Sequence, residues 1–199
     1  VTGVQTCALP ILRCGLRILM QEGIIISKQR SGYYVNKPRI VKNVFHLEST
    51  SEAIFEQGLN MKIKILNIEK KETNKQLSTK LRLPLGTKVY CLQRLRIIDD
   101  EPVSVDTSYL PIKYAQGLEK KDFESRALYQ ILESEYDISI NRSEQEILIC
   151  EADNYIANAL HVELGTQMVL QQGLAYDNDN RQIEYSESIM KMERFVYVN

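Results

Sequence analysis

The sequence has little of what metal centres, disulfide scaffolds and membrane spans require. It contains no tryptophan, two histidines and four cysteines, and no two cysteines form a C-x-x-C pair. A zinc site or a histidine-based catalytic triad is therefore not expected, and the cysteines are interpreted as reduced thiols. The absence of an apolar run of about 18 residues and of a basic-then-apolar leader predicts a cytoplasmic protein without a membrane span. We expect neither a metal nor a cofactor.

Charge is divided unevenly along the chain. The net charge is −1 overall, but residues 1–43 carry seven Lys or Arg and one Glu, a net charge of +6, which leaves −7 for residues 44–199. A basic segment attached to an acidic one favours contact between the basic segment and a polyanion. The composition, 44% hydrophobic and 26% charged, is that of a globular protein with one medium core and a smaller appendage.

The basic segment has the pattern of a helix followed by a hairpin. Apolar residues recur with helical spacing from Leu12, and Gly23 is expected to end this helix as its C′ residue. Two short strands, 24–28 and 33–35, flank a turn at 29–32. A helix followed by a basic, glycine-tipped hairpin is the second half of a winged helix.

The stretch LRCGLRILMQEGIIISKQRSGYYV resembles the end of the DNA-binding domain of the GntR family. It follows most of the pattern V-R-x-A-L-x-x-L-x-x-E-G-x-I-x-x-x-x-G-x-G-x-(F/Y)-V, with a glycine in place of the alanine and an arginine in place of the first wing glycine. In that family the helix enters the major groove of DNA and the wing enters the minor groove. The resemblance therefore implies contacts with DNA from Arg13, Arg17, Lys28, Arg30 and Gly32.

The chain leaves little room for the rest of that domain. The family has two earlier helices, but only residues 1–11 precede the matching stretch, and their sequence VTGVQTCALPI resembles the translation of a sequencing-library adapter. We therefore expect residues 1–11 not to be native sequence, residues 12–37 to form a partial winged-helix domain, and residues 38–43 to be a linker.

A second hairpin, within residues 93–111, carries a polar face. Strand alternation places Arg94 and Arg96 on one face of its first strand, and an Asp-Asp-Glu turn leads to the return strand. A three-residue turn would set Arg94 opposite Asp106 and Arg96 opposite Ser104. This constellation is either a cross-strand ion pair on a solvated sheet or part of a ligand site.

An internal repeat favours the ligand site. Residues 81–87 and 160–166 share the pattern L-x-(L/V)-x-L-G-T, and each copy is followed by two predicted strands. With one residue fewer in the turn of the second copy, Asp106 aligns with Glu184. Two copies packed about a pseudo-twofold axis would line a cleft with both carboxylates and with arginines from the first copy alone. Such an asymmetric set of charges is typical of a small-ligand pocket.

Two serines lie near the predicted starts of helices. Ser51 belongs to a Ser-Thr-Ser-Glu segment ahead of a predicted helix at 52–57, and Ser125 belongs to an Asp-Phe-Glu-Ser segment ahead of a predicted helix at 127–136. The free N–H groups at a helix start can hold an anion, although plain capping also explains such serines.

Residues 44–199 resemble the UTRA domain, the effector-sensing half of HutC-type GntR regulators. The resemblance rests on R-x-R, D-x-(E/Q)-P and S-x-(I/L)-P at 94–111, on L-Y-x-(I/L)-L-E-x-x-Y at 128–136, and on A-x-x-L-x-(V/L)-x-x-G-(T/S) at 157–166. In members that sense sugar phosphates, two arginines and hydroxyls near helix starts hold the phosphate, and two acidic residues hold sugar hydroxyls. The resemblance therefore implies an anion clamp of Arg94, Arg96, Ser51 and Ser125, with Asp106 and Glu184 as hydroxyl-binding residues.

The sequence thus predicts an α+β fold, with an antiparallel UTRA sheet flanked by helices and preceded by the C-terminal half of a winged helix-turn-helix. The resemblance implies a homodimeric bacterial regulator, a repressor, that binds a small anionic effector such as a sugar phosphate and so controls its binding to operator DNA. Two alternatives stay open. The UTRA fold resembles chorismate lyase, so the chain could be an enzyme, although the basic segment argues against this. It could also be a dimerisation module with a vestigial pocket.

Overall fold

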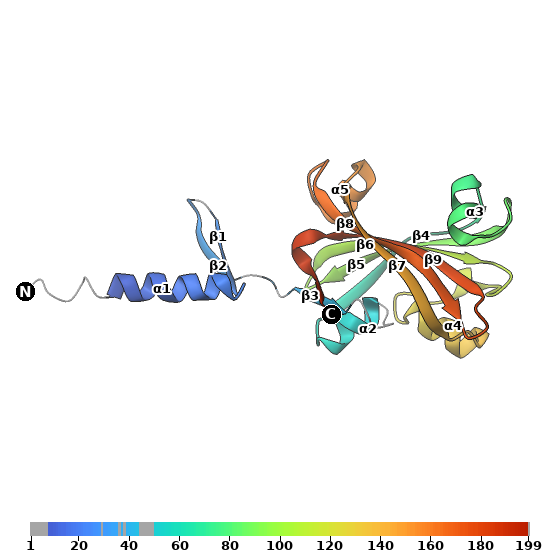
Figure 1. Ribbon diagram of the computed structural model, residues 1–199, viewed down its shortest axis with the longest axis horizontal. Helices are drawn as coiled ribbons and strands as arrows, with labels where there is room; N and C mark the ends of the chain where they lie inside the picture. The colour runs from blue at the N-terminus through green and yellow to red at the C-terminus, as the bar shows by residue number, and fades with distance from the viewer. Residues whose placement is uncertain (1–7, 29, 36, 38, 44–49, 199) are drawn as a thin grey trace, which may run out of the picture. The chain divides into compact units, whose positions relative to one another are not determined.

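The computed structural model describes residues 8–28, 30–35, 37, 39–43 and 50–198. It divides the chain into an N-terminal unit, residues 1–39, and a C-terminal unit, residues 40–199 (Figure 1). The expectation that residues 1–11 are not native sequence falls largely outside the described residues.

The N-terminal unit is a helix followed by a hairpin, as predicted. It contains α1 (Ala8–Gln21), β1 (Ile25–Lys28) and β2 (Gly32–Val35), and the two strands pair antiparallel. The helix was predicted to start at Leu12, but it begins four residues earlier, at Ala8. Pro10 is compatible with this start, because it lies in the first turn of the helix and its missing N–H is tolerated there. Gly23 ends it with φ of 72° and donates to the carbonyl of Met20 at 3.1 Å, which confirms its predicted role.

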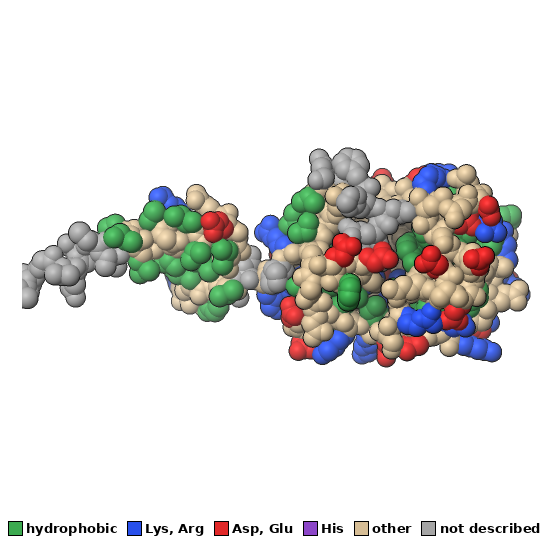
Figure 2. Space-filling model, turned by 90° about the horizontal axis from the view of Figure 1, so that it is seen from below, with side chains coloured by type: hydrophobic (Ala, Val, Ile, Leu, Met, Phe, Trp, Pro, Cys, Tyr) green, Lys and Arg blue, Asp and Glu red, His purple; other side chains and the backbone are tan. Residues whose placement is uncertain are grey.

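Apolar side chains of α1 are exposed within this unit. Figure 2 shows hydrophobic side chains gathered on it. Leu12 and Met20, from the predicted apolar stripe, are 59% and 42% exposed, whereas Leu16 and Leu19 are partly buried. The stripe is therefore only partly covered by the residues that the structure describes.

The C-terminal unit is built on a six-stranded antiparallel sheet with the strand order β4-β5-β6-β9-β8-β7. These strands are β4 (Met61–Glu72), β5 (Lys88–Ile98), β6 (Glu101–Pro111), β7 (Ile140–Glu151), β8 (Gln167–Asp177) and β9 (Gln182–Lys191). A separate parallel pair joins β3 (Ile40–Asn43) to β10 (Phe195–Val198). Residues 40–43 were predicted to belong to a linker, and this was wrong because their pairing partner lies at the opposite end of the chain.

Helices cover both faces of the sheet (Figure 1). They are α2 (Thr50–Glu56), α3 (Lys75–Leu81), α4 (Leu128–Tyr136) and α5 (Asn154–Leu160), with short 3-10 helices η1 (Leu118–Lys120) and η2 (Met192–Arg194). Strand alternation sends Val89 of β5 to the core beneath α3, and Tyr90 and Leu92 to the core beneath α4. The sheet face that carries the two arginines of β5 is thus the one turned to α2 and α4.

The sheet consists of two copies of one β-α-β-β unit. β4, α3, β5 and β6 form the first copy, and β7, α5, β8 and β9 form the second. The side chains of Asn74 and Asp153 cap α3 and α5 in the same way, each accepting a backbone N–H at 2.8 Å. Gly86 and Gly165 in the L-G-T turns adopt φ of 77° and 79°. The predicted repeat is confirmed, and it extends one strand further toward the N-terminus than predicted.

The predicted alignment of Asp106 with Glu184 is wrong by two residues. The two L-G-T turns lie 79 positions apart, which makes Gly173 the counterpart of Arg94. Arg94 pairs with Asp106 and Gly173 pairs with Ser186, so Ser186 is the counterpart of Asp106. The second hairpin has one residue more between its paired positions, not one fewer. Asp106 and Glu184 therefore come from non-equivalent positions, although alternation keeps both on the same sheet face.

Candidate functional site

β5 and β6 bring four polar side chains together on the sheet face turned to α2 and α4. Arg94 pairs with Asp106 and Arg96 pairs with Ser104, as predicted. The turn between the strands differs from the prediction, because it contains two residues and not three. Both of these residues, Asp99 and Asp100, have positive φ. A β-bulge, in which Val103 is the extra residue, restores the predicted register.

Arg96 is tied into the fold by a buried ion pair. Its Nε donates to Asp106 Oδ2, and its Nη1 donates to Ser51 Oγ at 2.7 Å. Ser104 Oγ donates to the other oxygen of Asp106 at 3.2 Å. Burial alone would raise the pKa of Asp106, but the positive charges of Arg96 and Arg94 outweigh burial and lower it. Asp106 is therefore a carboxylate, and its pairing with Arg96 is satisfied within the protein.

Arg94 has a different environment. It is 6% exposed, and its Nη2 donates to Ser108 Oγ at 3.1 Å. Its buried Nε meets no hydrogen-bond acceptor among the described residues. Burial lowers the pKa of Arg94, and the charge of Arg96 lowers it further, yet a guanidinium stays charged in proteins. A buried cation with an unused donor is unfavourable on its own and is prepared to bind an anion.

Glu184 supplies a second carboxylate from β9. The hydroxyl of Tyr129, on α4, donates to Glu184 Oε2 at 2.7 Å. Burial raises the pKa of Tyr129, and the negative charge of Glu184 raises it further. The phenol therefore stays protonated and serves as a fixed donor, which orients the carboxylate.

These side chains line one open cavity. Its charged lining consists of three cations and two carboxylates, namely Lys42, Arg94, Arg96, Asp106 and Glu184. Hydroxyl and amide side chains complete the polar lining, among them Ser51, Ser108, Ser186, Ser188, Gln171 and Gln172. The cavity thus offers both donors for an anion and acceptors for hydroxyl groups.

Five of the six predicted effector-binding residues line this cavity, and Ser125 does not. Ser125 is exposed and lines a different hollow, whose lining also includes Ser51. The carboxylate of Asp122 accepts the backbone N–H groups of Glu124 and Ser125, which turns the chain away before α4 begins after Ala127. Ser51 also differs locally, since it lies inside the first turn of α2 rather than at its N-cap. The binding roles of the five residues remain predictions.

The cavity lining also includes residues that were not predicted from the sequence, among them Lys42, Tyr129 and Gln171. Lys42 lies in the segment that was interpreted as a linker, and local pattern alone could not reveal its strand. Tyr129 was predicted only as a residue of the pattern at 128–136, without a role in the cavity. Gln171 follows an apolar run in β8, and its polar character on a strand facing the cavity was a signal that could have been used.

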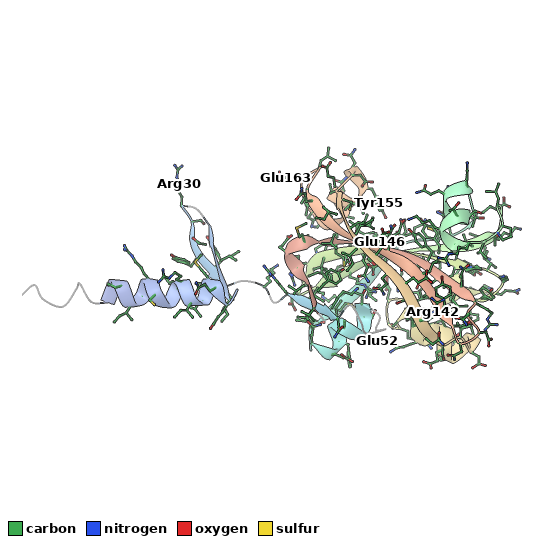
Figure 3. The ribbon with its side chains drawn as sticks, viewed as in Figure 1. Arg30, Glu52, Arg142, Glu146, Tyr155 and Glu163 are labelled. Atoms are coloured by element: carbon green, nitrogen blue, oxygen red, sulfur yellow. The ribbon has the colours of Figure 1, made fainter. Side chains whose placement is uncertain are left out.

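The residues predicted to contact DNA all lie in the N-terminal unit. Arg13 and Arg17 are exposed on α1, and Arg30 stands at the tip of the hairpin (Figure 3). Lys28 ends β1, and Gly32 begins β2 with φ of 107°, a value that favours glycine. These positions are compatible with a wing, and the DNA contacts themselves remain predictions.

Among the residues that the structure describes, no three His, Cys, Asp or Glu side chains are grouped so as to hold a metal ion. No helix among the described residues is long and apolar enough to cross a membrane. The described cysteines, Cys14, Cys91 and Cys150, are not joined in disulfides.

Known proteins of similar sequence and fold are transcription regulators. The family model of the UTRA domain matches residues 56–196. The HTH-type transcriptional repressor NagR of Bacillus subtilis is 23% identical over 188 residues, which cover 94% of this chain and 77% of the relative. The mannosyl-D-glycerate transport/metabolism system repressor MngR of Escherichia coli is 23% identical over 186 residues, with coverage of 94% and 77%.

A solved structure has the same fold over nearly the whole chain. PhnF from Mycobacterium smegmatis aligns with a TM-score of 0.81 and 26% identity, covering 96% of this chain and 85% of that chain. The predicted α+β class is therefore confirmed. Since the UTRA model matches well over half of the residues, the chain belongs to the UTRA domain family, as a transcription regulator of the GntR type.

Proposed function

We propose that a small anionic metabolite, such as a sugar phosphate, binds in the cavity of the C-terminal unit and changes how the N-terminal unit binds operator DNA. The protein acts in the cytoplasm as a homodimer and as a repressor. Arg94, Arg96 and Ser51 hold the anionic group of the ligand, and Asp106 and Glu184 accept hydrogen bonds from its hydroxyl groups.

One observation carries this proposal, namely the buried Nε of Arg94 without an acceptor among the described residues. An unsatisfied guanidinium N–H destabilises the folded chain, and this cost is not expected for a residue with a purely structural role. A ligand phosphate or carboxylate would accept this N–H in a charge-assisted hydrogen bond, which is about twice as strong as a neutral one. Ligand binding would therefore satisfy the unused donor of Arg94, and this gain in free energy would contribute to the binding affinity.

The remainder of the cavity favours a ligand with hydroxyl groups next to its anionic group. Tyr129 fixes the carboxylate of Glu184, while Ser186 and Ser188 present hydroxyls beside it. An apolar acid would leave these polar groups without partners, which disfavours its binding. The name of the relative MngR, which refers to mannosyl-D-glycerate, supports a sugar derivative as the ligand class.

Regulation follows from linkage between the two units. The excess of positive charge in residues 1–43 supports contact with the phosphates of DNA, which alone gives salt-sensitive binding without sequence preference. A ligand that prefers one arrangement of the dimer shifts the spacing of its two DNA-binding units. The ligand can change the affinity for operator DNA only to the extent that it binds one arrangement of the dimer more tightly than the other.

Calorimetric titration with matched pairs of ligands tests the proposal. Glucose 6-phosphate and glucose, or glycerol 3-phosphate and glycerol, differ only in the anionic group. We expect measurable binding for phosphorylated members of such a panel and none for their neutral counterparts. A panel in which phosphate and carboxylate compounds bind no better than neutral sugars would contradict the proposal.

A further inference from the structure

Lys42 brings a cation into the cavity from outside the six-stranded sheet. It lies on β3, which pairs with β10 so that Lys42 is opposite Tyr197. Its side chain nevertheless lines the same cavity as Arg94 and Arg96, and the residue is only 6% exposed. A lysine ammonium is rarely buried to this extent unless it has partners.

The partners that the structure shows for this ammonium include two neutral groups of the cavity wall. Its Nζ donates to Thr50 Oγ1 at 3.0 Å and to Gln171 Oε1 at 2.6 Å. The same amide oxygen accepts the hydroxyl of Tyr197 at 2.9 Å, and its amide nitrogen donates to Gln145. Lys42 is therefore held at the cavity by polar groups of α2 and β8.

An anion in the cavity would be a better acceptor for this ammonium than a hydroxyl or an amide. Hydrogen bonds between charged partners are shorter and about twice as strong as those between neutral ones. The ammonium can also turn about its flexible stem toward a new acceptor, because its three donors rotate freely. A bound anion would therefore accept a hydrogen bond from Lys42, either in place of Thr50 or Gln171 or in addition to them.

The position of β3 in the chain makes this contact significant. Ile40, its first residue, directly follows Arg39, the last residue of the N-terminal unit. A second link runs through α2, since Gln57 just beyond this helix accepts the N–H of Val41 and donates to its carbonyl, both at 2.8 Å. The start of the same helix contributes Ser51 to the cavity. The strand that leads into the N-terminal unit is thus tied to the cavity twice.

The geometry points to Lys42 as a third cationic contact of the bound anion, through which occupancy of the cavity acts on β3 and so on the segment joining the two units. This inference rests on the proposed function, because it requires that the cavity binds an anion. It adds a residue and a route of regulation to that function.

The test uses the full chain, with inorganic phosphate as the probe, and compares Lys42→Gln with Lys42→Arg and Lys64→Gln. Lys64 is an exposed lysine of β4 outside the cavity lining, so its variant controls for the loss of one positive charge. Phosphate affinity is measured by calorimetry. Amide hydrogen exchange of residues 40–43 is measured with and without phosphate, and circular dichroism checks that each variant is folded.

We expect Lys42→Gln to weaken phosphate binding about tenfold and to abolish the phosphate-dependent change in exchange at residues 40–43. Lys42→Arg and Lys64→Gln should retain both. Wild-type affinity and wild-type exchange in Lys42→Gln, with binding lost in Arg94→Gln, would overturn the inference while leaving the proposed function intact. If the wild-type chain bound no phosphate and no phosphorylated sugar, both would fall together. If Lys42→Gln did not fold, the test would use Lys42→Arg. A Lys42→Arg variant that bound phosphate but showed no phosphate-dependent change in amide exchange at residues 40–43 would contradict the route through β3.

Discussion

The two buried arginines of β5 should respond to substitution to different extents. Arg96→Met removes the partner of Asp106 and leaves its charge buried, which we expect to lower the free energy of unfolding by about 3–5 kcal/mol. Arg94→Met removes a charge-assisted hydrogen bond to Ser108, which costs about 1.5–3 kcal/mol. It also removes a desolvated cation, which Arg96 repels and which Asp106 and Glu184 attract, so that loss is offset only in part. Ligand-free Arg94→Met should therefore lose less stability than Arg96→Met, about 1–2 kcal/mol relative to the wild type.

The same substitution should weaken ligand binding. Losing a charge-assisted hydrogen bond to a phosphate costs about 1.5–3 kcal/mol, or roughly 10- to 100-fold in affinity. Urea denaturation monitored by circular dichroism gives the stabilities, and calorimetry with a phosphorylated sugar gives the affinities. If Arg94→Met destabilised the chain as much as Arg96→Met, Arg94 would be a structural residue. The interpretation of the domain as a dimerisation module with a vestigial pocket would then be favoured.

Three further predictions concern acid stability, packing and catalysis. The pKa of Asp106 is lower in the folded chain than its unfolded value of about 3.9, so its carboxylate contributes stability above that value, and this stability is lost as pH falls through the folded pKa. Asp106→Asn should therefore be less stable than the wild type at pH 7 by urea denaturation, and the difference in unfolding free energy should shrink on acidification. A difference that stays constant with pH would contradict this. A Cβ at Gly173 would lie 2.1 Å from the carbonyl oxygen of Glu144, so Gly173→Ala should lower the unfolding free energy by about 1–3 kcal/mol, and unchanged stability would be the contrary result. Incubation with chorismate should release no pyruvate in a coupled assay, and release at catalytic rates would support the enzyme alternative.

The polar face of the central hairpin could be predicted because it depends on local rules. Alternation with period two placed Arg94 and Arg96 together, and the register set Asp106 opposite Arg94. The turn was predicted one residue too long, and the bulge at Val103 compensated for that difference. The side-chain pairing is nevertheless diagonal, since Arg96 rather than Arg94 binds Asp106. Strand register fixes which side chains share a face, but not which of them bind.

The rest of the site depends on contacts between distant parts of the chain. Lys42 reaches the cavity because β3 pairs with β10 at the opposite end of the sequence, and no local pattern encodes such a pairing. Ser125 was placed in the site by its nearness to a helix start, but the turn made by Asp122 directs it elsewhere. The repeat was found from the L-G-T turns, whereas its register depended on hairpin lengths that only the strand pairing reveals.

A crystal structure of the chain grown with a phosphorylated sugar would show whether Arg94 binds the anionic group of the ligand. We expect the phosphate within hydrogen-bonding distance of Arg94 Nε, with Arg96 and Ser51 beside it and the sugar hydroxyls turned to Glu184. A phosphate held only by exposed lysines, or a ligand bound outside this cavity while Arg94 keeps its unpaired Nε, would contradict it.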